Sequence, residues 1–145
     1  MTDSYKNNKS NYRIVMVVEK DDELRSAARK ALQNSGYGVL TARNGEEALS
    51  LMDQIRVDAV ISDVQLSKIS GLDLARQIRE NYSDTFVVLA TGNTGFSSPT
   101  EAISNGAGAF LYKPVNYDEL KSLLSYHFSK LVAADSEQTI NTFQG

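Results

Sequence analysis

Short apolar runs alternate along most of this 145-residue chain with segments in which apolar residues recur at helical spacing. The runs are rich in Val, Ile, Leu and Ala and are bounded by polar residues, which is typical of strands buried on both faces of a sheet. We therefore expect five strands, which span residues 13–18, 38–42, 58–63, 85–90 and 109–112.

Between the strands, apolar residues three and four positions apart predict amphipathic helices, each with one apolar stripe. The expected stripes are Leu24, Ala27, Ala28, Ala31 and Leu32; Ala48, Met52 and Ile55; Leu74, Ala75 and Ile78; and Leu120, Leu123, Leu124, Phe128 and Leu131. A further helix is expected to begin at Ser98 and Pro99, because proline is well tolerated in a first turn. Strands that alternate with helices predict right-handed crossovers and a parallel sheet. The fold class is therefore α/β, a doubly wound five-stranded parallel sheet with five helices.

The two ends of the chain differ from this pattern. Residues 1–11 are dominated by Asn, Ser, Lys and Asp, and we expect a flexible tail there because little apolar surface is available to offset the entropy of ordering. Residues 133–145 are also polar and are expected to form a flexible C-terminal tail. One domain, residues 12–132, lies between them, as the chain length favours.

Charge and composition narrow the classes of function. The net charge is −3 and basic residues are not clustered, which argues against nucleic acid or an anionic membrane as a partner. The chain contains no cysteine, so disulfides, thiolate catalysis and cysteine metal sites are excluded. No apolar stretch is long enough for a membrane span and the start lacks the apolar core of a signal peptide, so we expect a cytoplasmic protein.

Polar residues follow four of the predicted strands at the points where those strands end. In a parallel sheet the carboxyl ends of the strands meet at one edge, and ligands bind there. We therefore expect one site made by the residues after the first, third, fourth and fifth strands: Glu19 with Lys20, Asp63, Thr91 and Lys113.

The spacing of these residues resembles that of a known family. Gly71 follows Asp63 by eight residues, Thr91 and Gly92 begin 28 residues after Asp63, and Lys113-Pro114 begins a further 22 residues on. Residues 13–131 thus resemble the receiver domain of bacterial two-component response regulators, in the single-domain form of the chemotaxis response regulator. The resemblance implies a flavodoxin-like sheet with strand order 2-1-3-4-5.

The resemblance also implies roles for residues of the site. Asp63 matches the phosphoacceptor, which takes a phosphoryl group from a histidine kinase or a histidine phosphotransfer protein in a phosphorelay. Lys113 would contact the phosphoryl oxygens, and its bond to Pro114 would be cis. Thr91 would move its hydroxyl onto the phosphoryl group, and Phe110 stands at the position of the switch aromatic. Such a protein is a phosphoryl acceptor rather than an enzyme, with slow autodephosphorylation as the one reaction left open.

The implied partners are proteins. The resemblance places the downstream target on the face formed by the fourth strand, the fourth helix, the fifth strand and the fifth helix. It names neither the cognate kinase nor the target.

The chain departs from the family at the metal site. The family carries two adjacent acids after the first strand, and the second binds Mg²⁺ directly; here these positions are Glu19 and Lys20. Two unit charges about 4 Å apart interact by roughly 4 kcal/mol at an effective dielectric of about 20, so an ammonium in place of a carboxylate opposes metal binding. The remaining metal ligands would be Glu19, Asp63, the backbone carbonyl of Gln65 and, as a further candidate, Asp21. We expect Mg²⁺ to bind weakly or not at all.

Two other interpretations of this region stay open. A slip in the register would make Asp21 and Asp22 the acidic pair. Alternatively, Lys20 could point to solvent while Asp21 takes over as the metal ligand, although Asp21 is also suited to cap the first helix.

The sequence favours a single-domain response regulator that is phosphorylated on Asp63 and signals through protein contacts. The alternative is a phosphorylation-independent pseudo-receiver, an interaction module in which Lys20 replaces the metal and pairs with Asp63. A flavin carrier on a similar sheet is disfavoured, because the acidic run at residues 19–23 would repel a phosphate group.

Overall fold

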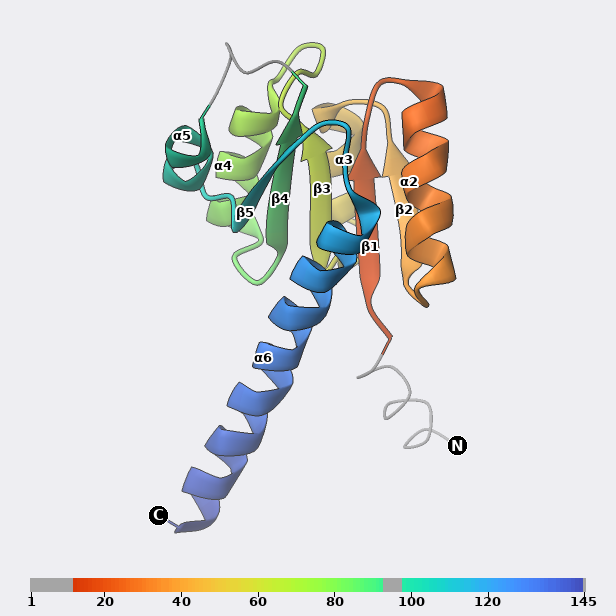
Figure 1. Ribbon diagram of the computed structural model, residues 1–145. Helices are drawn as coiled ribbons and strands as arrows, with labels where there is room; N and C mark the ends of the chain where they lie inside the picture. Colours follow the sequence, from red (N-terminus) through yellow and green to blue (C-terminus); the bar gives the residue numbers. More distant parts are fainter. Residues whose placement is uncertain (1–11, 93–97, 145) are drawn as a thin grey trace. The chain divides into compact units, whose positions relative to one another are not determined.

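The computed structural model describes residues 12–92 and 98–144, with side chains as far as residue 134, and contains a five-stranded parallel sheet (Figure 1). The strand order is β2-β1-β3-β4-β5. The strands are β1 (Ile14–Val18), β2 (Gly38–Ala42), β3 (Ala59–Asp63), β4 (Phe86–Thr91) and β5 (Ala109–Tyr112). Each predicted strand is present, and the doubly wound order 2-1-3-4-5 is confirmed.

Five helices alternate with the strands within the described residues. They are α2 (Asp22–Asn34), α3 (Gly45–Met52), α4 (Gly71–Asn81), α5 (Pro99–Ser104) and α6 (Tyr117–Gln144). All five begin after a short polar residue whose side chain accepts a backbone N–H of the first turn, which satisfies a donor that the helix itself cannot. These N-cap residues are Asp21, Asn44, Ser70, Ser98 and Asn116.

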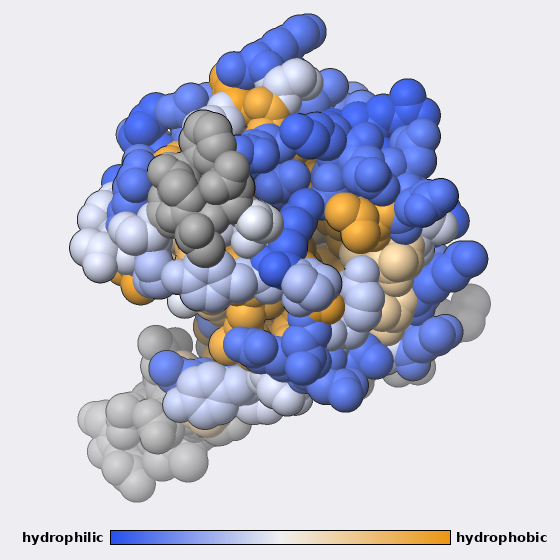
Figure 2. Space-filling view, turned by 45° about the horizontal axis from the view of Figure 1, so that its top comes forward, coloured by the Kyte–Doolittle hydropathy of each residue, from blue (hydrophilic) through white to orange (hydrophobic). Residues whose placement is uncertain are grey.

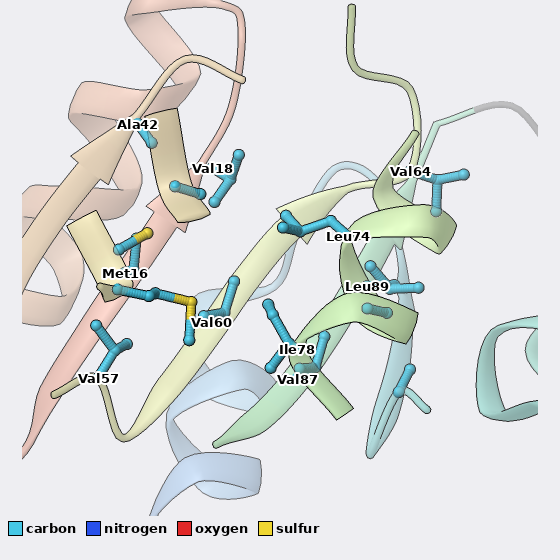
Figure 3. Close-up of a cluster of buried hydrophobic side chains, with 14 of the residues drawn as sticks. Met16, Val18, Ala42, Val57, Val60, Val64, Leu74, Ile78, Val87 and Leu89 are labelled. Atoms are coloured by element: carbon cyan, nitrogen blue, oxygen red, sulfur yellow. The ribbon is translucent and has the colours of Figure 1, made fainter. Parts of the chain in front are cut away.

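Alternate residues of the strands point to opposite faces of the sheet, as the two-residue period of a strand requires. Met16 of β1, Val60 of β3 and Leu89 of β4 belong to one cluster with side chains of α3 and α4 (Figure 3). Val15 and Val17, the neighbours of Met16, are buried outside that cluster, and α2 packs on β1 and β2. The central strands are therefore covered on both faces, which explains their continuous apolar sequences.

The register of the strands brings their last residues to nearly the same level. Val18 lies opposite Ser62, Asp63 opposite Ala90, and Thr91 opposite Tyr112. The residues that follow β1 and β5, and those that end β3 and β4, therefore meet at the carboxyl edge.

Some details differ from the sequence-based expectation. Helix α3 ends at Met52, so Ile55 does not lie on its apolar face and is exposed. Leu24 is also exposed, because it lies in the first turn of α2 and burial begins only at Ala28. Leu131, the last residue of its predicted stripe, is exposed as well.

The last helix is longer than its stripe predicts. The chain separates into a unit that ends at Val115 and contains the sheet, and a unit from Asn116 that consists mainly of α6. Helix α6 continues to Gln144, through the range 133–144 that we expected to be a tail. The expected N-terminal tail, residues 1–11, lies outside the described residues, and the domain boundaries at 12 and 132 stay predictions.

Candidate functional site

Buried polar side chains are concentrated at the carboxyl edge of the sheet. In the part of the chain that the structure describes, the buried polar or charged residues are Glu19, Ser62, Asp63 and Thr91. Glu19 and Asp63 are each 7% exposed and Thr91 is 1% exposed. Figure 2 brings this edge forward and shows a largely hydrophilic surface in which apolar residues appear between polar ones. Because burying a charge is costly unless it is paired, these carboxylates require a partner.

Lys113 is that partner. Its Nζ lies 2.5 Å from Glu19 Oε1 and 3.1 Å from Asp63 Oδ2, so one ammonium bridges two carboxylates and leaves one negative charge in excess. Burial lowers the pKa of Lys113, but the hydrogen bonds to Glu19 and Asp63 outweigh this effect and hold the pKa above its usual value. Lys113 is therefore a cation at neutral pH.

Asp63 is fixed by the backbone around it. Its Oδ1 accepts a hydrogen bond of 3.0 Å from the Gln65 N–H, and the next residue, Val64, donates to the carbonyl of Ala90 at 2.9 Å. Gly71 packs directly on this segment: a Cβ atom there would lie 2.2 Å from the Asp63 carbonyl oxygen and 2.7 Å from Val64 Cα. Only glycine allows α4 to begin so close to the end of β3.

Two other predicted residues lie on the neighbouring strands. The carbonyl of Thr91 accepts the backbone N–H of Lys113 at 2.8 Å, which ties the end of β4 to the end of β5. Phe110 is half-buried against the core, and its ring makes an edge contact with exposed Tyr112 at 5.3 Å between centroids. The Lys113-Pro114 peptide bond is cis, as the resemblance implied.

Lys20 does not take part in this arrangement. It is exposed and forms no ion pair within residues 12–92 and 98–134, so the Lys20–Asp63 pair of the alternative interpretation is not formed. Lys113 provides the cation beside Asp63 instead. The interpretation that Lys20 faces solvent agrees with the structure.

The donor set fits Mg²⁺ poorly. Among the described residues, no three acidic, histidine or cysteine side chains lie close enough to hold a metal ion together. Glu19 and Asp63 both accept hydrogen bonds from Lys113, and Asp21 uses Oδ1 to cap α2 through the Leu24 N–H at 2.9 Å. A magnesium ion requires oxygen ligands in near-octahedral geometry, so it would have to compete with an ammonium already in place.

Arg25 was not assigned to the site from the sequence, although it contacts one of the site residues. Arg25 donates from Nη1 to the backbone carbonyl of Glu19 at 2.9 Å. Its position six residues after Glu19, on the first helix, is the only signal that the sequence offers. Several other arginines of the chain lie on helices without contacting the site, so residue type alone could not distinguish it.

A five-stranded parallel sheet with a buried Asp at the end of its third strand and a Lys after its fifth defines a receiver-type signalling domain. Residues 15–125 match the family model described as the response regulator receiver domain. The chain belongs to this family, whose members are signalling modules of two-component systems.

Curated relatives agree with this assignment. Response regulator MprA of Mycolicibacterium vanbaalenii is 34% identical over 106 residues, which cover 73% of this chain and 46% of that protein. The MprA protein of Mycobacterium avium is 32% identical over 106 residues, with the same coverage. The chain thus spans about half the length of the curated relatives that it matches.

Solved structures also agree. The chemotaxis response regulator CheY4 of Vibrio cholerae superimposes with a TM-score of 0.72 at 31% identity, covering 79% of this chain and 98% of CheY4. The response regulator TrrA of Thermotoga maritima, solved in complex with Mg²⁺-BeF, has a TM-score of 0.71 at 32% identity, covering 79% of this chain and 97% of TrrA. Separately, none of the described helices is both long and apolar enough to cross a membrane.

Proposed function

We propose that this receiver domain accepts a phosphoryl group on Asp63 from a histidine kinase or a histidine phosphotransfer protein and signals through protein contacts. The observation that carries the proposal is the pairing of buried Asp63 with Lys113, which also holds Glu19. Asp63 lies at the carboxyl edge of the sheet, where parallel α/β folds bind ligands.

The transfer requires positioning and charge neutralisation more than covalent assistance. A carboxylate oxygen of Asp63 forms a bond to phosphorus while the phosphorus–nitrogen bond of a donor phosphohistidine breaks, and the departing imidazole nitrogen takes a proton from solvent. Lys113, 3.1 Å from Asp63 Oδ2, supports the charge on the phosphoryl oxygens. The Thr91 hydroxyl then binds the new phosphoryl group, and Phe110 follows it as the switch aromatic.

We further propose that Mg²⁺ binds weakly and that phosphorylation is slow. Lys20 stands where the family has its second acid, and the two buried acids already share Lys113. An ammonium in place of a carboxylate removes a metal ligand and adds a like charge, so it lowers metal affinity, although solvent screens part of the effect because Lys20 is exposed. Asp21, the other candidate ligand, is engaged as a helix cap.

A second candidate function is a phosphorylation-independent interaction module. The 2.5 Å contact between Lys113 and Glu19 favours it, because the acidic site already has an internal cation. In this version Lys113, rather than Lys20, replaces the metal. For either function we propose that the downstream protein contacts α5 and β5, where Ile103 and Tyr112 are exposed apolar side chains.

Exposure to acetyl phosphate, followed by intact-mass measurement, distinguishes the two functions. We expect slow addition of one phosphoryl group to the wild type and none to Asp63→Asn. With Lys20→Asp, which restores the second acid, labelling should become faster and should respond to Mg²⁺. Absence of labelling in the wild type together with labelling of Lys20→Asp would favour the interaction module. Labelling that persists in Asp63→Asn would refute Asp63 as the acceptor.

A further inference from the structure

Glu19 lies in a connection that has no regular structure of its own. Residues 19–21 join the end of β1 at Val18 to the start of α2 at Asp22. The backbone N–H of Glu19 donates to the carbonyl of Ala42 on β2 at 3.0 Å, which fixes one side of the residue. The position of the Glu19 backbone therefore also depends on what holds its carbonyl.

Arg25 holds that carbonyl. Arg25 Nη1 donates to Glu19 O at 2.9 Å, and Nη2 pairs with Asp22 Oδ1 at 2.5 Å. The Arg25 side chain is only 13% exposed, so it is largely shielded from solvent. Its planar fork joins Glu19, the first residue of the connection, to Asp22, the first residue of α2, which a single ammonium could not do with the same geometry.

The contacts continue from Glu19 to the phosphoacceptor. Glu19 Oε2 accepts the backbone N–H of Asp21 at 3.0 Å, and Glu19 Oε1 accepts Lys113 Nζ at 2.5 Å. The same Nζ lies 3.1 Å from Asp63 Oδ2. Movement of the Glu19 backbone would thus shift the carboxylate that places Lys113 beside Asp63.

We propose that Arg25 is a positioning residue for phosphoryl transfer at Asp63. It holds the Glu19 carbonyl, so that the Glu19 carboxylate keeps Lys113 beside the acceptor oxygen. The proposal rests on the proposed function of Asp63, whereas the effect of Arg25 on the connection at residues 19–21 can be tested without it.

The chain contains a matched control. Arg76 pairs with Asp73 at 2.6 Å in the first turn of α4, with the same spacing of three residues that Arg25 and Asp22 have. Its other contact is the side chain of Asn105 at 3.2 Å, and the Arg76 side chain is 45% exposed. Loss of Arg76 removes a comparable helix ion pair, and within the described residues Arg76 forms no hydrogen bond or ion pair with Glu19, Asp63 or Lys113.

The first measurement is the rate of labelling by acetyl phosphate. We expect Arg25→Met to slow labelling roughly tenfold, because small displacements of positioned groups are costly in transfer reactions. Arg76→Met should label like the wild type. In a Glu19→Gln background, Arg25→Met should have little further effect, since the residue through which it acts is already altered. If Arg25→Met slows labelling equally in the wild-type and Glu19→Gln backgrounds, the effect reflects a general loss of stability, and the proposal is overturned.

The second measurement does not depend on phosphorylation. Hydrogen exchange of the Asp21 amide, followed by NMR, reports the hydrogen bond to Glu19 Oε2. We expect faster exchange in Arg25→Met and no change in Arg76→Met. Asp22→Asn, which frees Arg25 from its other partner, should give a smaller change in the same direction and serves if Arg25→Met does not fold.

The two measurements separate the two proposals. If the wild type is not labelled, the proposed function fails, and exchange at Asp21 still decides whether Arg25 positions Glu19. If Arg25→Met and Asp22→Asn leave both the labelling rate and the Asp21 exchange unchanged, the role of Arg25 is refuted.

Discussion

Two aspartates mark the two ends of β3, and their surroundings differ. Asp58 immediately precedes the strand; its carboxylate accepts the Ile14 N–H at 2.8 Å and lies 3.8 Å from Arg13 and 3.9 Å from Arg56. Asp63 ends the strand and shares a single ammonium, that of Lys113, with a second carboxylate. Asp58 thus has two cations nearby, whereas Asp63 shares its one cation with Glu19.

The difference shows which features make a site. A pocket of about 480 Å³ opens beside Asp58, lined by residues 52–58 and 81–85, so the amino edge of the sheet offers open space. It lacks a buried cation shared between acids. The carboxyl edge has excess negative charge, a fixed ammonium and the buried hydroxyl of Thr91. Charge arrangement, rather than pocket volume, therefore distinguishes the candidate site.

Replacing Asp58 or Asp63 by asparagine tests this comparison, and the largest effect on labelling is expected here. Asp63→Asn should abolish labelling by acetyl phosphate, because an amide is not a nucleophile for phosphoryl transfer. Asp58→Asn should leave labelling intact, since it changes only contacts at the amino edge. Intact mass gives the result for both variants. Equal loss of labelling in both would show that the effect reflects general damage to the fold.

Gly71→Ala should mainly affect the stability of the carboxyl edge. A Cβ atom at Gly71 would overlap the backbone of Asp63 and Val64, and overpacking of this kind costs about 1–3 kcal/mol of unfolding free energy. Gly92→Ala is the control, because its Cβ would lie 3.6 Å from Lys113 Cβ, an ordinary contact. Urea denaturation measures both. Equal stability of the two variants would contradict the close approach of α4 to β3.

Thr85→Val should weaken the opposite edge without changing the site. Thr85 Oγ1 donates to the Val57 carbonyl at 2.8 Å, and loss of such a bond costs about 1 kcal/mol. The labelling rate should remain that of the wild type. A large change in labelling would mean that the two edges of the sheet are coupled.

The smallest effect is expected at the surface pair of Asp73 and Arg76. Hydrogen bonds from Arg76, and then from Ser70, hold the pKa of Asp73 below its usual value. Because the folded-state pKa is the lower one, this pair stabilises the fold at neutral pH, and the contribution disappears as pH falls through that pKa. In Arg76→Met the Asp73 pKa, measured by NMR titration, should rise, and the difference in stability should vanish in acid. An unchanged pKa would contradict the pairing.

The sequence was sufficient for the sheet and for four of the residues that meet at its carboxyl edge. Continuous apolar strands and helical spacing predict the fold, and strand ends predict that Glu19, Asp63, Thr91 and Lys113 meet, because backbone topology alone brings them together. Side-chain partners could not be predicted. Whether Lys20 or Lys113 pairs with Asp63 depends on the path of the connection after β1, which long-range hydrogen bonds determine.

The ends of the helices were also harder to predict than the presence of the helices. Ile55 follows Met52 at the three-residue spacing of a helix, yet α3 ends at Met52. Nothing in the pattern of apolar residues marks that end. Helix α6 likewise continues beyond Leu131 to Gln144, because polar residues can extend a helix after its apolar stripe ends.

A Mg²⁺ titration, followed by the amide shifts of residues around Asp63, tests most directly whether Lys113 and Lys20 leave the site without strong metal binding. We expect no saturation of the wild type below about 1 mM, and tighter binding in Lys20→Asp, since this change removes a cation near the site and adds a carboxylate at the position of the family's second acid. Saturation of the wild type below about 1 mM would contradict this view of the site.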